Sequence, residues 1–116
     1  MIEAPSKPVA KLQGSPLLDL IGNTPLLRLD RLSAHLPGIQ ILGKAEWRNP
    51  GGSVKDRAAS SIVAAALREG KLGNGQILSA RGKTLIDATS GNTGIAYAML
   101  GAAMGFPVLL LSLIHI

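Results

Sequence analysis

The chain has 116 residues, enough for one small domain or a piece of a larger one, and 47% of them are hydrophobic while 16% are charged. So large an apolar share excludes a disordered charged tail, because such a chain must bury much of its surface. The absence of cysteine excludes a disulfide scaffold and cysteine-ligated zinc, and two histidines predict no metal site. The net charge is +5, but basic residues are scattered among acidic ones, so we expect no nucleic-acid partner.

The first elements of the chain are expected to be short. Residues 1–14 are polar and lack the apolar stretch of a secretory signal, so we expect a cytoplasmic protein. A helical segment is predicted over residues 17–21, and a turn over residues 22–25 ends it. Apolar residues in the next stretches predict two strands, at residues 26–29 and 39–45.

The second half of the chain alternates between helices and strands. After a glycine-rich turn, Ser53 is expected to cap a helix that ends at Gly70, with Asp56 completing a capping-box-like pair. Further elements follow at residues 84–88 (strand), 95–104 (helix) and 106–111 (strand). Such alternation predicts an α/β fold in which helices flank a parallel sheet.

The end of the chain has an alternative interpretation. Residues 95–116 carry no charge from Asp, Glu, Lys or Arg and are about long enough to cross a bilayer. Gly101, Gly105 and Pro107 interrupt this stretch, and no basic anchor follows it. These features favour a buried helix and strand, so we expect no membrane contact, with a membrane-tethered segment as the alternative.

A glycine-rich loop at residues 89–94 is expected between a strand and a helix. There, backbone N–H groups and the hydroxyls of Thr89, Ser90 and Thr93 would meet at a helix N-terminus, which suits a carboxylate or a phosphate. An ordinary strand-to-helix turn explains the same pattern equally well. Neither this loop nor residues 82–84 have the glycine spacing of a nucleotide-binding motif.

Lys55 falls in the first turn of the helix expected after Ser53. The helix dipole disfavours a cation at this end, and a lysine that loses its proton readily is a nucleophile toward aldehydes. Such a lysine is what Schiff-base chemistry requires. A solvated lysine whose charge Asp56 offsets is the simpler interpretation of this position taken alone.

Three motifs stand in a fixed order along the chain: residues 21–26 read IGNTPL, residues 49–57 read NPGGSVKDR and residues 89–94 read TSGNTG. They are similar to the N-terminal signature, the cofactor-attachment motif and the asparagine loop of the cysteine synthase and cystathionine β-synthase family. This resemblance continues to about Leu110. It implies the incomplete N-terminal portion of a fold-type II enzyme that uses pyridoxal 5'-phosphate.

The resemblance also assigns a role to individual residues. Lys55 would hold pyridoxal phosphate in a Schiff base and act as the general base, and Asn92 would hydrogen-bond the cofactor's ring hydroxyl oxygen. The loop expected to bind the substrate carboxylate consists of Thr89, Ser90, Gly91, Asn92 and Thr93.

The implied reaction is a β-replacement, in which an O-acylated serine loses its acyl group to give an aminoacrylate and sulfide then adds to form cysteine. A cystathionine β-synthase type of enzyme is one alternative, and a non-catalytic binding fragment is another. The resemblance implies an amino-acid substrate and a homodimeric parent enzyme. The family's phosphate-binding cup is not among the three motifs, so we expect the chain itself to be inactive.

The hexapeptide LSLIHI at residues 111–116 does not fit the family. It is encoded in frame by CTG TCT CTT ATA CAC ATC, the end sequence of a transposon adapter used to prepare sequencing libraries. We therefore expect residues 1–110 to be the N-terminal part of the catalytic region and residues 111–116 to be a non-native tail.

Overall fold

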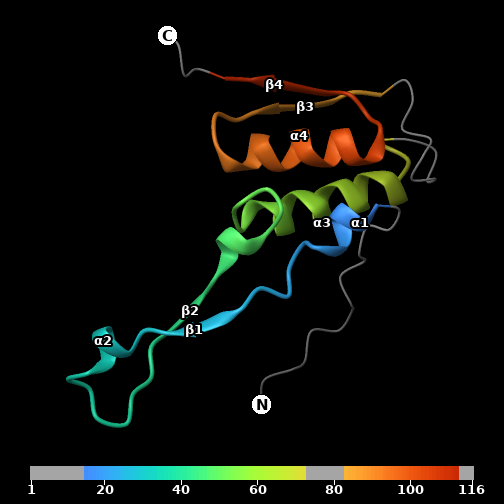
Figure 1. Cartoon of the computed structure of the whole chain (residues 1–116). Helices are drawn as coiled ribbons and strands as arrows, with labels where there is room; N and C mark the ends of the chain where they lie inside the picture. Colours follow the sequence, from blue (N-terminus) through green and yellow to red (C-terminus); the bar gives the residue numbers. More distant parts are fainter. Residues whose placement is uncertain (1–14, 73–82, 113–116) are drawn as a thin grey trace.

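The computed structural model describes residues 15–72 and 83–112 (Figure 1). The polar start expected at residues 1–14 and the last four residues of the expected tail lie outside the described residues. In chain order the elements are α1 (Pro16–Asp19), β1 (Leu26–Arg28), α2 (Asp30–Ser33), β2 (Leu42–Lys44), the 3₁₀ helix η1 (Glu46–Arg48), α3 (Lys55–Arg68), β3 (Leu85–Ala88), α4 (Asn92–Met104) and β4 (Val108–Leu111).

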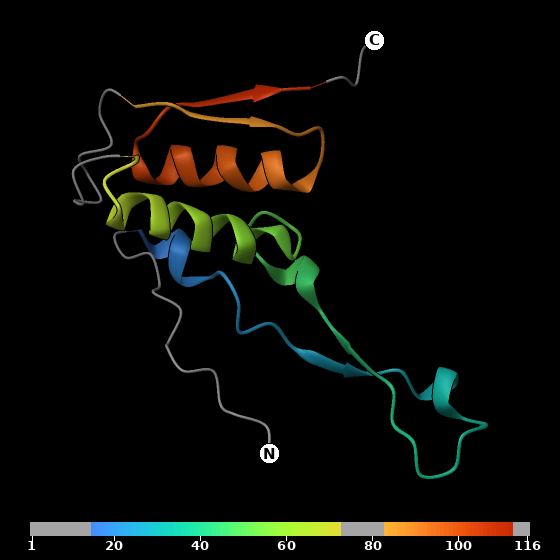
Figure 2. The same ribbon diagram turned by 180° about the vertical axis from the view of Figure 1, so that it is seen from behind.

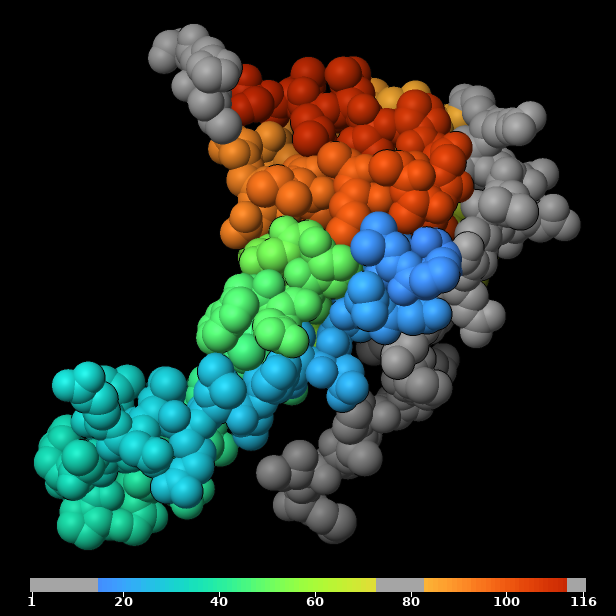
Figure 3. Space-filling view, in the orientation of Figure 1, coloured from blue at the N-terminus to red at the C-terminus, as the bar shows by residue number. Residues whose placement is uncertain are grey.

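The elements form two regions, which we call the body and the arm. In the body, α4 lies between the sheet of β3 and β4 on one side and α3 on the other, and α1 contacts α4 (Figures 1 and 2). The arm contains β1, α2 and β2 (Figures 1 and 2). The arm extends away from the body as a separate lobe, as the space-filling view also shows (Figure 3).

The strands form two separate pairs. β3 and β4 are parallel, with Leu85 opposite Val108 and Ala88 opposite Leu111. The predicted α/β fold with a parallel sheet beside helices is therefore confirmed. β1 and β2 lie outside that sheet as an antiparallel pair, with Leu26 opposite Lys44.

The antiparallel pairing in the arm follows from the connection between its strands. A parallel pair needs a crossover, usually a helix that packs on the sheet. Here the connection contains only α2, a single turn in which no residue is buried, so the chain reverses and returns beside β1. β2 is shorter than the strand predicted at residues 39–45, because the N–H of Ile39 donates to the Leu36 carbonyl in a turn.

The start of α3 differs from the expected capping box. The helix begins at Lys55, so Val54 rather than Ser53 is its N-cap, although the Ser53 hydroxyl accepts a hydrogen bond from the Lys55 N–H, with an N–O distance of 3.1 Å. The Asp56 carboxylate does not reach back to Ser53; it accepts a 2.6 Å hydrogen bond from the N–H of Gly51. The reason is the turn before the helix, where Gly52 has a φ of 86° and the loop folds over the first helical turn.

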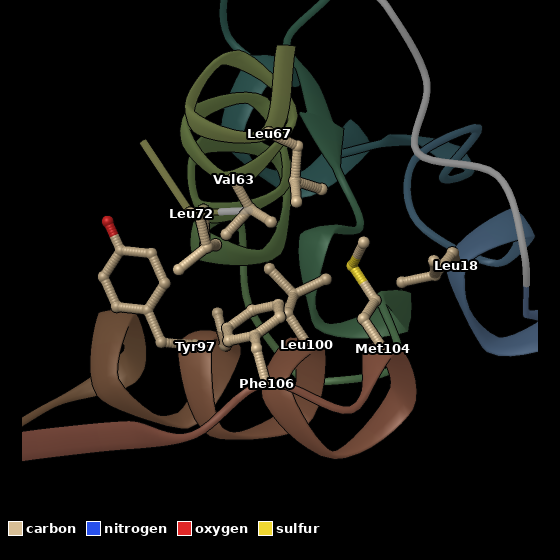
Figure 4. Close-up of a cluster of buried hydrophobic side chains, with 10 residues drawn as sticks. Leu18, Val63, Leu67, Leu72, Tyr97, Leu100, Met104 and Phe106 are labelled. Atoms are coloured by element: carbon tan, nitrogen blue, oxygen red, sulfur yellow. The ribbon is translucent and has the colours of Figure 1, made fainter. Parts of the chain in front are cut away.

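The core of the body lies between α3 and α4. Side chains of the two helices face one another there, and residues from α1 and from the chain before β4 complete the cluster (Figure 4). Its members are Leu18, Ala59, Val63, Leu67, Leu72, Ala96, Tyr97, Leu100, Met104 and Phe106. Each long helix is thus held by an apolar face that its partner helix covers.

α4 packs closely on β4 through glycine. A Cβ atom on Gly101 would lie 2.6 Å from Cγ2 of Val108 and 2.8 Å from the Phe106 carbonyl oxygen, so no larger residue fits without movement. Gly105, with a φ of 79°, ends the helix as the sequence predicts, whereas the helix starts at Asn92, three residues earlier than expected.

The apolar end of the chain is shared between α4 and β4. Within the described residues, no helix has both the length and the hydropathy that crossing a membrane requires. The face that α4 buries is instead covered by α3, as Leu100 at 0% exposure shows.

Candidate active site

Lys55 is the first residue of α3, and its side chain is exposed. Among the described residues, its amine forms no hydrogen bond and no ion pair. Asp56 is its neighbour in sequence but is buried and faces the loop, so it does not pair with the amine. The structure therefore presents an accessible primary amine at the N-terminus of a helix.

The loop before Lys55 is held by a carboxylate that sequence reasoning missed. Oε1 of Glu46 accepts hydrogen bonds from the Thr24 hydroxyl at 2.6 Å and from Nη2 of Arg57 at 3.0 Å. Its Oε2 accepts from Nε of Arg57 at 2.9 Å and from Nδ2 of Asn49 at 2.8 Å. Arg57, then Thr24, lower the pKa of Glu46 from 4.5 to about 2.

Asn49 joins this carboxylate to the rest of the loop. Its amide nitrogen also donates to the carbonyls of Glu46 and Ser53, at 2.8 and 3.0 Å. Its amide oxygen accepts a 2.8 Å hydrogen bond from the N–H of Gly22. Since Asn49 is only 3% exposed, water does not compete strongly for these bonds. One side chain thus connects both ends of the loop with the turn before β1.

Asp56 fixes the middle of the same loop from inside the helix. Its side chain is fully buried, and burial raises the pKa of this carboxyl, while the hydrogen bond from Gly51 lowers it. Its Oδ1 has no hydrogen-bond partner in the described part of the chain. A side chain at position 51 would clash with this oxygen, so the contact requires glycine there.

The loop at residues 89–93 leads from β3 into α4, and Gly91 is the N-cap of that helix. No side chain caps α4, and no described residue accepts a hydrogen bond from the N–H groups of Asn92 and Thr93. Ser90, Gly91 and Asn92 are exposed. Unsatisfied N–H groups at the positive end of a helix suit an anion such as a carboxylate.

The two predicted parts of the site lie at the same end of the body. α3 and α4 run side by side and begin at the same end, which is the end where β3 leads into the loop at residues 89–93 (Figures 1 and 2). In open α/β sheets, ligands bind outside the carboxyl ends of the strands. No hydrogen bond or ion pair joins Lys55 to this loop within the described residues, so their shared role stays a prediction.

The chemistry of these groups fits the cofactor that the sequence predicts. An accessible lysine amine can attach an aldehyde, and an uncapped helix N-terminus can bind an anionic group. Residues 17–112 match the sequence model of a family described as pyridoxal-phosphate dependent enzyme, and the chain belongs to that family.

Within this family, the chain is similar to cysteine synthases. It is 52% identical over 94 residues to the cysteine synthase of Aquifex aeolicus (strain VF5), which covers 79% of this chain and 27% of that protein. It is 44% identical over 100 residues to cysteine synthase B of Pseudomonas syringae pv. syringae, which covers 86% of this chain and 54% of that protein. The chain thus spans only part of the length of these relatives.

Solved structures agree with this relationship. The crystal structure of O-ureido-L-serine synthase aligns with a TM-score of 0.71 and 42% identity, over 87% of this chain and 29% of that one. The O-acetylserine dependent cystathionine beta-synthase of Helicobacter pylori aligns with a TM-score of 0.68 and 29% identity, over 85% of this chain and 30% of that one. The α/β fold of the chain therefore corresponds to the N-terminal part of such enzymes.

Proposed function

We propose that the enzyme to which this chain belongs makes cysteine from an O-acylated serine and sulfide, by β-replacement with pyridoxal phosphate. The observation that carries the proposal is the free amine of Lys55 at the end of the body where the loop at residues 89–93 opens α4. The similarity to cysteine synthases from several organisms supports the same reaction.

Lys55 has two tasks in this proposal. Its amine would hold the aldehyde of the cofactor, and the same amine, when free, would remove the α-proton of the substrate and hold it. When bound, pyridoxal phosphate supplies a sink for the electron pair left on the α-carbon. The side chain of Lys55 is exposed and has no partner among the described residues, which leaves the amine free to move between these tasks.

The loop at residues 89–93 holds and orients the substrate. Its N–H groups and the hydroxyls of Thr89, Ser90 and Thr93 bind the α-carboxylate, and the helix dipole of α4 favours that negative charge. The amide of Asn92 would hydrogen-bond the ring hydroxyl oxygen of the cofactor. The three motifs include no site for the cofactor phosphate, so we expect this chain alone to bind the cofactor weakly and to be inactive.

A cystathionine β-synthase type of reaction is the second candidate. The similarity to the O-acetylserine dependent enzyme of Helicobacter pylori favours it. The two reactions would use the same Lys55 and the same loop, and they differ in the sulfur compound that adds at the β-carbon. A rate comparison between sulfide and a thiol-containing amino acid separates them.

The setting of the enzyme is proposed from the sequence. Small amino acids are the expected substrates, and the scattered charges argue against a nucleic-acid partner. We propose a cytoplasmic homodimer, on the basis of the family resemblance.

Replacement of Lys55 in the longer gene product tests the proposed function. We expect Lys55→Ala to lower cysteine formation from O-acetylserine and sulfide by about 10²-fold to 10⁴-fold, because the general base is lost. It should also remove the cofactor absorbance that survives desalting. Lys71→Ala, which removes an exposed lysine that follows the C-terminal end of α3, is the control and should keep both. Full activity of Lys55→Ala would refute the proposal.

We also propose that residues 111–116 are a non-native tail. The proposed start of the tail, Leu111, is the last residue of β4. The match to the family's sequence model ends one residue later, at residue 112. The test is the genomic DNA beyond the codon for Leu110. We expect the frame to continue into a loop that starts near a proline; genomic codons for the six residues would contradict the proposal.

A further inference from the structure

Three separate parts of the chain meet at the carboxylate of Glu46. Thr24 comes from the turn before β1, Asn49 from the loop after η1, and Arg57 from the first turns of α3. Thr24 and Arg57 also contact each other, with 3.1 Å between the Thr24 hydroxyl and Nη2 of Arg57, although 33 positions separate them in sequence. Glu46 is therefore the common acceptor of a network that includes the first turn of α3, in which Lys55 also lies.

The network fixes the rotation of α3 about its axis. Arg57 binds Glu46 through both Nε and Nη2, and such a forked pair tolerates little change of direction. Lys55 and Arg57 are two residues apart, so they project about 200° apart around the helix. While Arg57 is held on one side of α3, the side from which the Lys55 amine projects is held as well.

The same network limits movement of the loop that leads into α3. Asn49 donates to the carboxylate of Glu46 and to the carbonyl of Ser53, so both ends of the loop are tied to one side chain. The hydrogen bond from Gly51 to Asp56 ties its middle. A loop held at three points cannot shift the first turn of α3 without breaking several hydrogen bonds.

We propose that Glu46 is a positioning residue for Lys55: it holds Thr24, Asn49 and Arg57 together and thereby sets the direction of the lysine amine. Glu46 itself need not touch the cofactor or the substrate. The inference rests on the proposed function for the role of Lys55, but it concerns a residue that the sequence motifs left unassigned.

The test measures how fast pyridoxal phosphate attaches to Lys55 in the full chain. Borohydride reduction makes the attachment permanent, and peptide mass spectrometry then identifies which lysine carries the label. Lys71 serves as the internal reference, because it is exposed and follows the C-terminal end of α3, far along the chain from Lys55. We expect Glu46→Gln to lower the Lys55:Lys71 labelling ratio about tenfold, as misplacement of a reacting group does. Asp30→Asn makes the same chemical change in an exposed ion pair of the arm and should leave the ratio unchanged.

A second variant separates positioning from general stability. Arg57→Lys keeps the positive charge but cannot form the forked pair, so positioning predicts a lower ratio here too. An unchanged Lys55:Lys71 labelling ratio in folded Glu46→Gln would overturn the inference. If Glu46→Gln does not fold, an unchanged ratio in Arg57→Lys would overturn it. Failure of the proposed function looks different: Lys55 and Lys71 would then be labelled equally in the unchanged chain.

Discussion

The body and the arm use apolar residues in opposite ways. In the body, α3 and α4 bury theirs against each other, and Val63 and Leu100 are completely buried. In the arm, every residue of β1 is exposed, and Leu26 and Leu32 each retain 58% of their accessible surface. Figure 3 shows that the arm stands apart from the body.

This contrast indicates that the two regions have different sources of stability. The body has an interior of its own, whereas the arm consists of two short strands, and an isolated two-stranded pair is marginally stable at best in water. An apolar arm without a core is typical of a surface that other protein covers. The two regions meet at Lys44, Glu46 and Thr24, where Lys44 donates to the Thr24 carbonyl at 2.6 Å. The network that holds the loop before Lys55 therefore lies at this junction.

The largest effect should come from removing a side chain from the body's interior. Leu100 is fully buried between the helices, so Leu100→Ala should lower the free energy of unfolding by about 2–5 kcal/mol. Urea denaturation followed by circular dichroism measures this change. The matched substitution in the arm is Leu26→Ala, which should change the free energy of unfolding by less than about 0.5 kcal/mol. Equal effects at the two positions would contradict the division into body and arm.

A smaller effect is expected where α4 meets β4. Gly101→Ala places a methyl group against Val108 and the Phe106 carbonyl, and such overpacking costs about 1–3 kcal/mol of folding stability. Gly91→Ala is the control, because a Cβ atom there would have no neighbour within 4 Å and the φ of −132° is open to any residue. If Gly101→Ala leaves the urea midpoint unchanged, the close packing of helix on sheet is not a source of the body's stability.

Local patterns predicted much of the body. Gly70 and Gly105 mark the ends of α3 and α4 because both adopt a positive φ, which the sequence indicates through glycine itself. The position of Lys55 in the first turn of α3 also follows from local signals. The hydrogen-bond partner of Asp56 does not follow from local signals. Ser53 is the partner that a capping box predicts, but the fold of the loop brings the N–H of Gly51 to the carboxylate instead.

The network around Glu46 could not be predicted in this way. Thr24 lies 22 positions before Glu46 and Arg57 lies 11 positions after it, so no helix or strand period relates them. Only the path of the chain through the arm and back brings these three side chains together. Periodicity describes which face of an element is buried, but it carries no information on which distant polar groups meet.

The smallest effect concerns how the junction responds to acid. The pKa of Glu46 is about 2 in the folded chain, below its ordinary value of 4.5, so the folded state binds this proton less readily than the unfolded state. Its contribution to stability is then complete above pH 4.5 and is lost as the pH falls toward 2. We expect the stability difference between the unchanged chain and Glu46→Gln to shrink over this range, as measured by urea midpoints at successive pH values.

Asp56 should show a pH dependence of the opposite sign, so it is a control that contacts the same loop from α3. Burial raises the pKa of its carboxyl, so the folded state takes up this proton more readily than the unfolded state does. Acidification through that raised pKa therefore adds stability, whereas the contribution of Glu46 is lost on acidification. Asp56→Asn should remove the stabilisation on acidification, because the Asn amide does not titrate. The loss of the Glu46 contribution at low pH should remain. If both variants change the pH profile in the same direction, the two carboxylates do not have the separate roles that their contacts assign to them.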